Sequence, residues 1–205
     1  AAVAFTTYRL YPSATAAGGL HLFFLALLGG GSLLLLVAPL RRGGRQPLFY
    51  AASTALAMAM LGVLEAQSSL ALFVVWELMT VAGYLLLLRR RQAAEQAYRY
   101  FVFSMGGALA LLAGLALLAT AGLELAPATL LRAIAGAGAG ATGGAAALVW
   151  PPGPTAVAAA LLITLGILVK VGALGLHVWL PGSYAEAEDE TTPIFSGVFS
   201  KAPLF

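Results

Sequence analysis

The chain has 205 residues, of which 61% are hydrophobic and only 9% are charged, and its mean hydropathy is +0.94. Soluble domains are roughly 45–50% apolar and about 25% charged, so this composition excludes an ordinary soluble domain and indicates that lipid surrounds the chain. The net charge of +3, with arginines gathered between apolar stretches, excludes a nucleic-acid-binding face, and the lack of cysteine excludes disulfides and thiolate-bound iron–sulfur clusters.

Five apolar stretches are long enough to cross a bilayer, and a sixth begins before the sequence stops. They lie at about 20–40, 48–64, 70–88, 98–123 and 155–180, and we expect Pro181-Gly182 to end the fifth. The sixth starts near Pro193 and is cut off at residue 205, so we interpret the chain as an internal fragment of a longer protein. The sequence predicts an all-α, polytopic transmembrane helix bundle, with residues 1–19 as an extramembrane lead-in and residues 20–205 as the membrane transporter domain.

The connections between the spans alternate in charge. The first–second connection has three arginines, the third–fourth connection has four including the run 89–91, and the second–third connection has none. Because short loops rich in Lys and Arg stay in the cytoplasm, the odd-numbered spans should run from outside to inside. Alternation then places the acidic segment 186–190 on the cytoplasmic side as well. The Ala/Gly-rich stretch 124–142 fits either a helix on the membrane surface or a flexible loop.

Three ionisable residues lie inside the predicted spans: Glu77 near the middle of the third, Lys170 near the middle of the fifth, and Lys201 in the sixth. A charge at the centre of a membrane helix costs roughly 2.5–3.5 kcal/mol on insertion scales, so such a residue faces a partner or water and is a functional candidate. Glu77 and Lys170 are therefore candidate partners. The alternative is a purely structural ion pair that locks two helices together.

Helical spacing relates these residues to their neighbours. Glu77, Thr80 and Tyr84 are spaced at i, i+3 and i+7 and share one face of the third span. Lys170 and His177 are seven apart, which places them two turns apart on one face of the fifth. A lysine and a histidine stacked beside a glutamate predict a proton-relay row, since each group can change charge when its neighbour does. Taken alone, His177 is more typical of an interfacial histidine, and Trp179 of an aromatic-belt anchor.

Three strings of residues resemble the motifs of a known family: WELM at 76–79 followed by GYLL at 83–86, Lys170 followed by LHVWLP at 176–181, and SK at 200–201. They are similar to the proton-conducting membrane subunits of respiratory complex I. The same family includes Mrp-type Na⁺/H⁺ antiporter subunits and the membrane arms of energy-converting hydrogenases. The resemblance is firmest over 66–205. It implies a fold of about fourteen helices in two inverted repeats, of which this chain holds the third helix to the start of the eighth, with the broken seventh helix at 155–180.

The resemblance also implies roles for four residues. Glu77 matches the glutamate that pairs with the lysine of the seventh helix, here Lys170. Lys201 matches the lysine that passes protons towards the centre of the subunit, and His177 matches the histidine of the HxWLP motif. The implied mechanism is a switch: when Glu77 moves away or loses its charge, Lys170 releases its proton along a hydrated path towards Lys201.

The sequence therefore predicts a proton-translocating subunit of a complex I-like (NADH-quinone oxidoreductase-like) assembly in the inner (cytoplasmic) membrane of a bacterium. Ser183-Tyr184 and the acidic run 186–190 depart from the usual complex I pattern and favour a divergent branch. Three alternatives stay open: an Mrp-type Na⁺/H⁺ antiporter subunit, a membrane-arm subunit of an energy-converting hydrogenase, and a structural membrane scaffold. Expected partners are other membrane subunits and hydrophilic redox subunits. We expect no cofactor, metal site or catalytic chemistry in this subunit itself, and the transported ion, its direction and the energy source stay open.

Overall fold

The computed structural model describes residues 16–37, 47–120, 122–123, 153–173 and 175–187, together with Thr192 and Ser196. The helices are α2 (Ala16–Val37), α3 (Pro47–Glu65), α4 (Ser69–Leu87), α5 (Ala94–Thr120), α7 (Pro154–Val171) and α8 (Trp179–Glu186), with a short 3-10 helix, η2 (Arg91–Ala93), before α5. No strand occurs in the residues just given, and the all-α prediction is confirmed.

Four of these helices, α3, α4, α5 and α7, are long and apolar enough to cross a membrane. They correspond to the second to fifth predicted spans, and α2 corresponds to the first, with a described apolar stretch at Leu22–Leu33. These helices support a multi-pass membrane protein. The predicted sixth span near Pro193 and the Ala/Gly-rich stretch 124–142 lie outside the described residues, and the fourteen-helix repeat stays a prediction.

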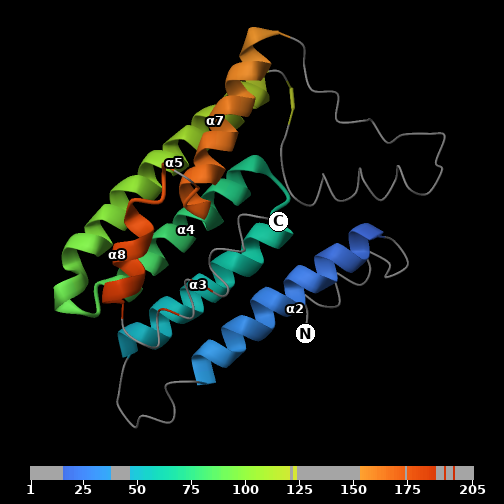
Figure 1. The fold of residues 1–205 in the computed structure, drawn as a ribbon. Helices are drawn as coiled ribbons and strands as arrows, with labels where there is room; N and C mark the ends of the chain where they lie inside the picture. The colour runs from blue at the N-terminus through green and yellow to red at the C-terminus, as the bar shows by residue number, and fades with distance from the viewer. Residues whose placement is uncertain are drawn as a thin grey trace.

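The helices pack against one another in chain order, α2 on α3, α3 on α4, α4 on α5 and α5 on α7, while α8 lies along one end of α5 (Figure 1). Short connections impose part of this order, since only residues 66–68 separate α3 from α4. Ser68 begins α4 as an N-cap, with its hydroxyl accepting a hydrogen bond from the Ala71 backbone N–H at 3.1 Å. The arrangement places the middle of α4 against α5 and brings the end of α7 into the same region.

Glycines allow α5 and α7 to approach closely. A Cβ atom added at Gly166 of α7 would lie 2.7 Å from the Gly107 carbonyl oxygen of α5, and one added at Gly114 would lie 2.9 Å from the Ala159 carbonyl oxygen. Small residues are typical of such contacts in membranes, where no hydrophobic force drives helices together and close packing must do so. This contact fixes α7, and with it Lys170, against α5.

The predicted fifth span is not one continuous helix to Leu180. Helix α7 ends at Val171, where Gly172 takes a left-handed conformation with φ 72°, and Gly175 has φ 88°. Helix α8 then begins at Trp179 and continues through Pro181 and Gly182 to Glu186, so the expectation that Pro181-Gly182 ends the span is wrong. Proline is tolerated there because it lies in the first turn of α8, where backbone N–H groups have no partner inside the helix. A break within 155–180 agrees with the broken seventh helix that the resemblance implies.

Candidate functional site

Lys170 is a buried lysine in the last turn of α7, with 1% of its surface exposed. Its Nζ donates a hydrogen bond of 2.6 Å to Thr80 Oγ1 of α4 and a long one of 3.5 Å to the Tyr100 hydroxyl of α5. The C-terminal end of a helix favours a cation, because the last carbonyl groups carry partial negative charge. Three helices therefore converge on one ammonium group.

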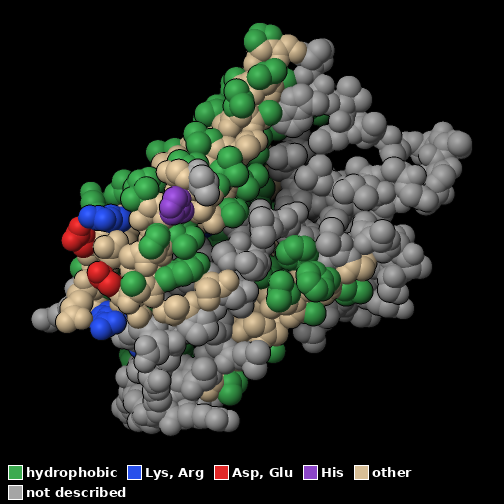
Figure 2. Space-filling view, viewed as in Figure 1, with side chains coloured by type: hydrophobic (Ala, Val, Ile, Leu, Met, Phe, Trp, Pro, Cys, Tyr) green, Lys and Arg blue, Asp and Glu red, His purple; other side chains and the backbone are tan. Residues whose placement is uncertain are grey.

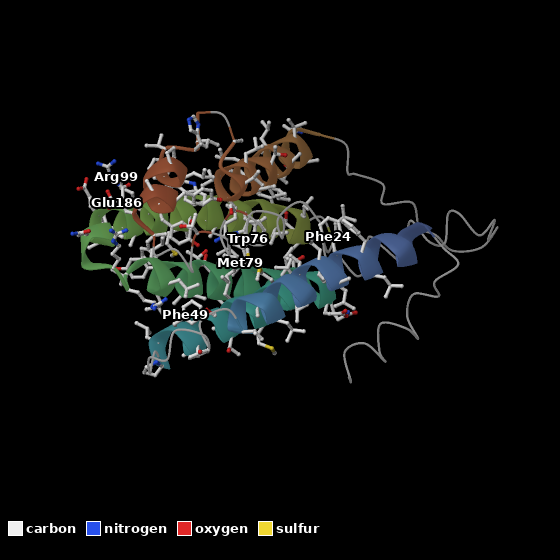
Figure 3. The ribbon with its side chains drawn as sticks, turned by 60° about the horizontal axis from the view of Figure 1, so that its bottom comes forward. Phe24, Phe49, Trp76, Met79, Arg99 and Glu186 are labelled. Atoms are coloured by element: carbon white, nitrogen blue, oxygen red, sulfur yellow. The ribbon has the colours of Figure 1, made fainter. Side chains whose placement is uncertain are left out.

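Aromatic rings complete the surroundings of this ammonium. Lys170 Nζ lies 5.9 Å from the centre of the Trp76 ring and 5.6 Å from the centre of the Tyr100 ring, within the range of cation–π attraction. Figure 3 shows Trp76 and Met79 midway along the bundle, whereas Arg99 and Glu186 lie together at one end. The site is thus inside the membrane-spanning part of the bundle.

Trp179 is buried rather than placed at the membrane surface. It is 1% exposed, its indole N–H donates to the Val169 carbonyl oxygen at 3.1 Å, and its ring packs against Tyr100 with centroids 5.1 Å apart. The aromatic-belt interpretation of Trp179 is therefore wrong, because the break after α7 lets α8 fold back onto α5. Trp179 holds together the two residues, Tyr100 and Val169, that flank Lys170.

Glu77 lies on α4, one turn before Thr80, and is partly buried. Its carboxylate interacts electrostatically with Lys170, but within the part of the chain that the structure describes no close ion pair joins the two. The carboxylate oxygen Oε1 is buried and has no hydrogen-bond partner among the described residues. The structure thus brings the two predicted partners into one region, with Thr80 as the α4 residue that Lys170 contacts.

His177 lies in the connection between α7 and α8 and is exposed. Its Nδ1 accepts a hydrogen bond of 3.2 Å from the Gly175 backbone N–H. The prediction that His177 stacks two turns beyond Lys170 on one helix face is wrong, because Gly172 and Gly175 interrupt the helix. The role of His177 in a relay stays a prediction, and Lys201 lies outside the described residues.

Tyr100 is a site residue that the sequence reasoning missed. It lies beside Arg99 near the start of α5, and from the sequence alone it is typical of a tyrosine at the membrane interface. The signal that could have found it is the spacing of small and polar residues along α5. Ala97, Tyr100 and Ser104 follow one another at intervals of three and four and are all buried, so they form the inner face of the helix.

Arg90, Glu95, Arg99 and Glu186 lie at one end of the described bundle. Figure 2 shows blue and red side chains together at one edge of the view. Arg99 pairs with Glu95 at 2.6 Å, and Arg90 donates a hydrogen bond of 3.4 Å to the Glu186 backbone carbonyl. This contact puts Glu186, the first residue of the acidic segment, at the same end as the arginine-rich connection, as alternation of the spans predicts. No group of three or more His, Cys, Asp or Glu residues that could hold a metal ion occurs in the described residues.

Residues 66–205, which include the whole site, match the family described as "NADH:quinone oxidoreductase/Mrp antiporter, TM". The chain belongs to this family. The resemblance drawn from the WELM and HxWLP strings is thereby confirmed, and membership makes this chain a membrane subunit of the proton-antiporter type. No match was found among curated proteins.

A solved structure is similar to this antiporter-type chain. It is a chain of the membrane-bound sulfane sulfur reductase, an archaeal respiratory membrane complex, with a TM-score of 0.70 and 24% sequence identity. The match covers 88% of this chain but 35% of that chain, so this chain spans about a third of the length of its structural neighbour. The likeness supports the helical architecture of the bundle.

Proposed function

We propose that this protein is a proton-translocating subunit of a multi-subunit respiratory assembly of the NADH-quinone oxidoreductase type, in the inner membrane of a bacterium. The observation that carries the proposal is Lys170, an ammonium group 1% exposed inside a membrane bundle, which interacts electrostatically with the carboxylate of Glu77. Ionisable residues are costly at such a depth, and ion pathways and proton relays are among the sites that they mark. The family match supports the same function.

Polar atoms around Lys170 support a hydrated path through the site. Trp76 Nε1 and Glu77 Oε1 are buried and make no hydrogen bond to the described residues. Buried polar groups are almost always satisfied, and ordered water is their usual partner where side chains do not reach them. Water at these atoms would link the carboxylate of α4 to the lysine of α7.

The order of proton carriers that we propose is Glu77, Lys170 and Lys201, with His177 at the break between α7 and α8. The left-handed Gly172 opens the helix directly after Lys170, and a non-helical backbone at membrane depth is tolerated where it lines a cavity or is covered by protein. Electron transfer and its cofactors would belong to hydrophilic partner subunits. The second candidate is an Mrp-type antiporter subunit, which would exchange Na⁺ for protons. The description of the matched family, which includes Mrp antiporters, favours it.

The proposal is tested by proton pumping into inside-out vesicles that contain the full-length subunit with its partner proteins. Lys170→Met keeps an unbranched side chain but removes the charge, and we expect pumping to fall on the order of tenfold or more with the assembly intact. Leu161→Ala is the matched control, because Leu161 is on the same helix, 65% exposed, and distant from the charge. Dependence of pumping on Na⁺ would favour the antiporter instead.

A structural scaffold with an inert buried pair predicts a different result. In that case Glu77→Gln combined with Lys170→Met would leave transport at the wild-type rate, because the double change removes both charges and leaves no unpaired one behind. Proton translocation through the pair predicts that the double variant is as inactive as Lys170→Met alone.

A further inference from the structure

Thr80 holds its hydroxyl in a fixed orientation towards Lys170. The residue is fully buried, its Oγ1 donates to the Trp76 carbonyl oxygen one turn earlier on α4 at 3.2 Å, and the same atom accepts from Lys170 Nζ at 2.6 Å. A hydroxyl has one proton to donate. Because that proton is committed to the Trp76 carbonyl, the lone pairs of Oγ1 are the part of the group that faces the lysine.

Tyr100 supplies a second hydroxyl of a different kind. It is also fully buried, and its hydroxyl lies 3.5 Å from Lys170 Nζ. A phenol can accept a hydrogen bond from an ammonium group, or turn its own proton towards the lone pair of a neutral amine. Thr80 and Tyr100 together can therefore hold the lysine before and after it gives up its proton.

Glu77 offers a contact that suits only one of these states. A carboxylate accepts hydrogen bonds and attracts the charged ammonium, and in a medium of low dielectric constant this attraction is strong. It gives a neutral amine no proton to accept. Glu77 and Thr80 lie one turn apart on the same helix, and Lys170 interacts with both, with Glu77 electrostatically and with Thr80 through its hydrogen bond.

We propose that Thr80 and Tyr100 form an uncharged docking station for Lys170, which holds the lysine apart from Glu77 in both of its protonation states. This inference rests on the proposed function. Thr80 is the positioning residue, because its bond to the Trp76 carbonyl fixes where the lysine docks. Without the station, Glu77 is the strongest acceptor in reach, the charged pair persists longer, and each transport cycle slows.

The test compares Thr80→Val with Thr80→Ser in the full-length subunit within its membrane assembly, with proton pumping in vesicles as the measurement. Valine keeps the shape of threonine and removes the hydroxyl, so we expect pumping about tenfold slower than wild type. Serine keeps the hydroxyl and loses only a methyl group, so it should retain most of the wild-type rate. A purely structural role predicts the opposite ranking, since valine fills the core better than serine.

Ser32→Ala is the matched control, because Ser32 on α2 is also buried and also donates to the carbonyl oxygen four residues earlier, that of Leu28, at 2.5 Å. Its pumping should stay close to wild type. If Thr80→Val does not assemble, Thr80→Ala replaces it in the same comparison with Thr80→Ser.

Lys170→Met in the same vesicles separates the two levels of inference. The station is supported if Thr80→Val pumps slowly, Thr80→Ser pumps at close to the wild-type rate and Lys170→Met does not pump. Wild-type pumping by Thr80→Val with inactive Lys170→Met overturns the station and leaves the proposed function standing. Wild-type pumping by Lys170→Met overturns both.

Discussion

A lysine buried in a membrane bundle destabilises the fold unless polar groups compensate for the water that it loses. For Lys170 the described compensation comes from two hydroxyls, two ring faces and the carbonyl end of α7. A close carboxylate favours the charged form of the lysine strongly. These groups favour it less, so they can contact the neutral form as well. A residue held in this way can change protonation state without losing all of its contacts, which is the property a proton carrier needs.

Tyr100→Phe separates the hydroxyl of this residue from its ring. The ring packs against Trp179 and should stay in place, so we expect the free energy of unfolding of the subunit to change by about 1 kcal/mol or less. Pumping should fall severalfold, because the neutral form of Lys170 loses its hydrogen-bond donor. Thermal unfolding in detergent and pumping in vesicles measure the two effects. An unchanged pumping rate would show that the Tyr100 hydroxyl takes no part in transport.

At the scale of single residues, the sequence predicted part of the site. Glu77 and Lys170 stand out because any charge within an apolar span is conspicuous, and the spacing of Glu77 and Thr80 correctly places them on one face of α4. Tyr100 did not stand out, because tyrosine near the end of a span is common at membrane interfaces. The identity of the residues that contact Lys170 depends on how far α7 is rotated and shifted against α4 and α5. Hydropathy carries no information on that rotation or shift.

At the scale of helices, hydropathy predicted the spans that became α3, α4, α5 and α7, and the family resemblance implied a break within 155–180 without giving its position. Long apolar runs separated by arginines or by the short polar segment before Ser69 correspond closely to α3, α4 and α5. The break after Val171 has a signal in Gly172 and Gly175, but glycine is common in membrane helices that remain continuous. The positive φ values of Gly172 and Gly175 interrupt the helix here, and the interruption accompanies the packing of α8 on α5.

The contact between α5 and α7 yields a prediction at this scale. Gly166→Ala places a methyl group against the Gly107 carbonyl oxygen and the Leu111 backbone nitrogen, which cannot move without shifting a helix. We expect a loss of roughly 1–3 kcal/mol in the stability of the subunit, together with slower pumping, since Lys170 lies one turn further along α7. Thermal unfolding of the purified assembly measures the first effect.

Gly106→Ala is the control for this change. Gly106 is on α5, next to Gly107, but no atom lies within 4 Å of where its Cβ would be. Alanine should therefore be tolerated there and should favour the helix slightly. Equal stability of the two variants would contradict a close α5–α7 contact.

At the scale of the whole molecule, the described part is an apolar helix bundle with a group of charged side chains where α8 meets the connection between α4 and α5. The contact of Arg90 with the Glu186 carbonyl ties α8 to the connection between α4 and α5, on the side that the arginines assign to the cytoplasm. The chain covers about a third of the length of its structural neighbour, and that neighbour is one chain of a larger respiratory complex. We expect other membrane subunits to cover apolar faces of this bundle.

The initial rate of proton uptake into inside-out vesicles, normalised to the amount of assembled subunit, tests the central claim most directly. If Lys170 carries the proton, Lys170→Met assembles normally and its rate falls on the order of tenfold or more, while Leu161→Ala on the same helix keeps the wild-type rate. A Lys170→Met assembly that takes up protons as fast as wild type would contradict the claim and reduce Lys170 to a structural tie between α7 and α4.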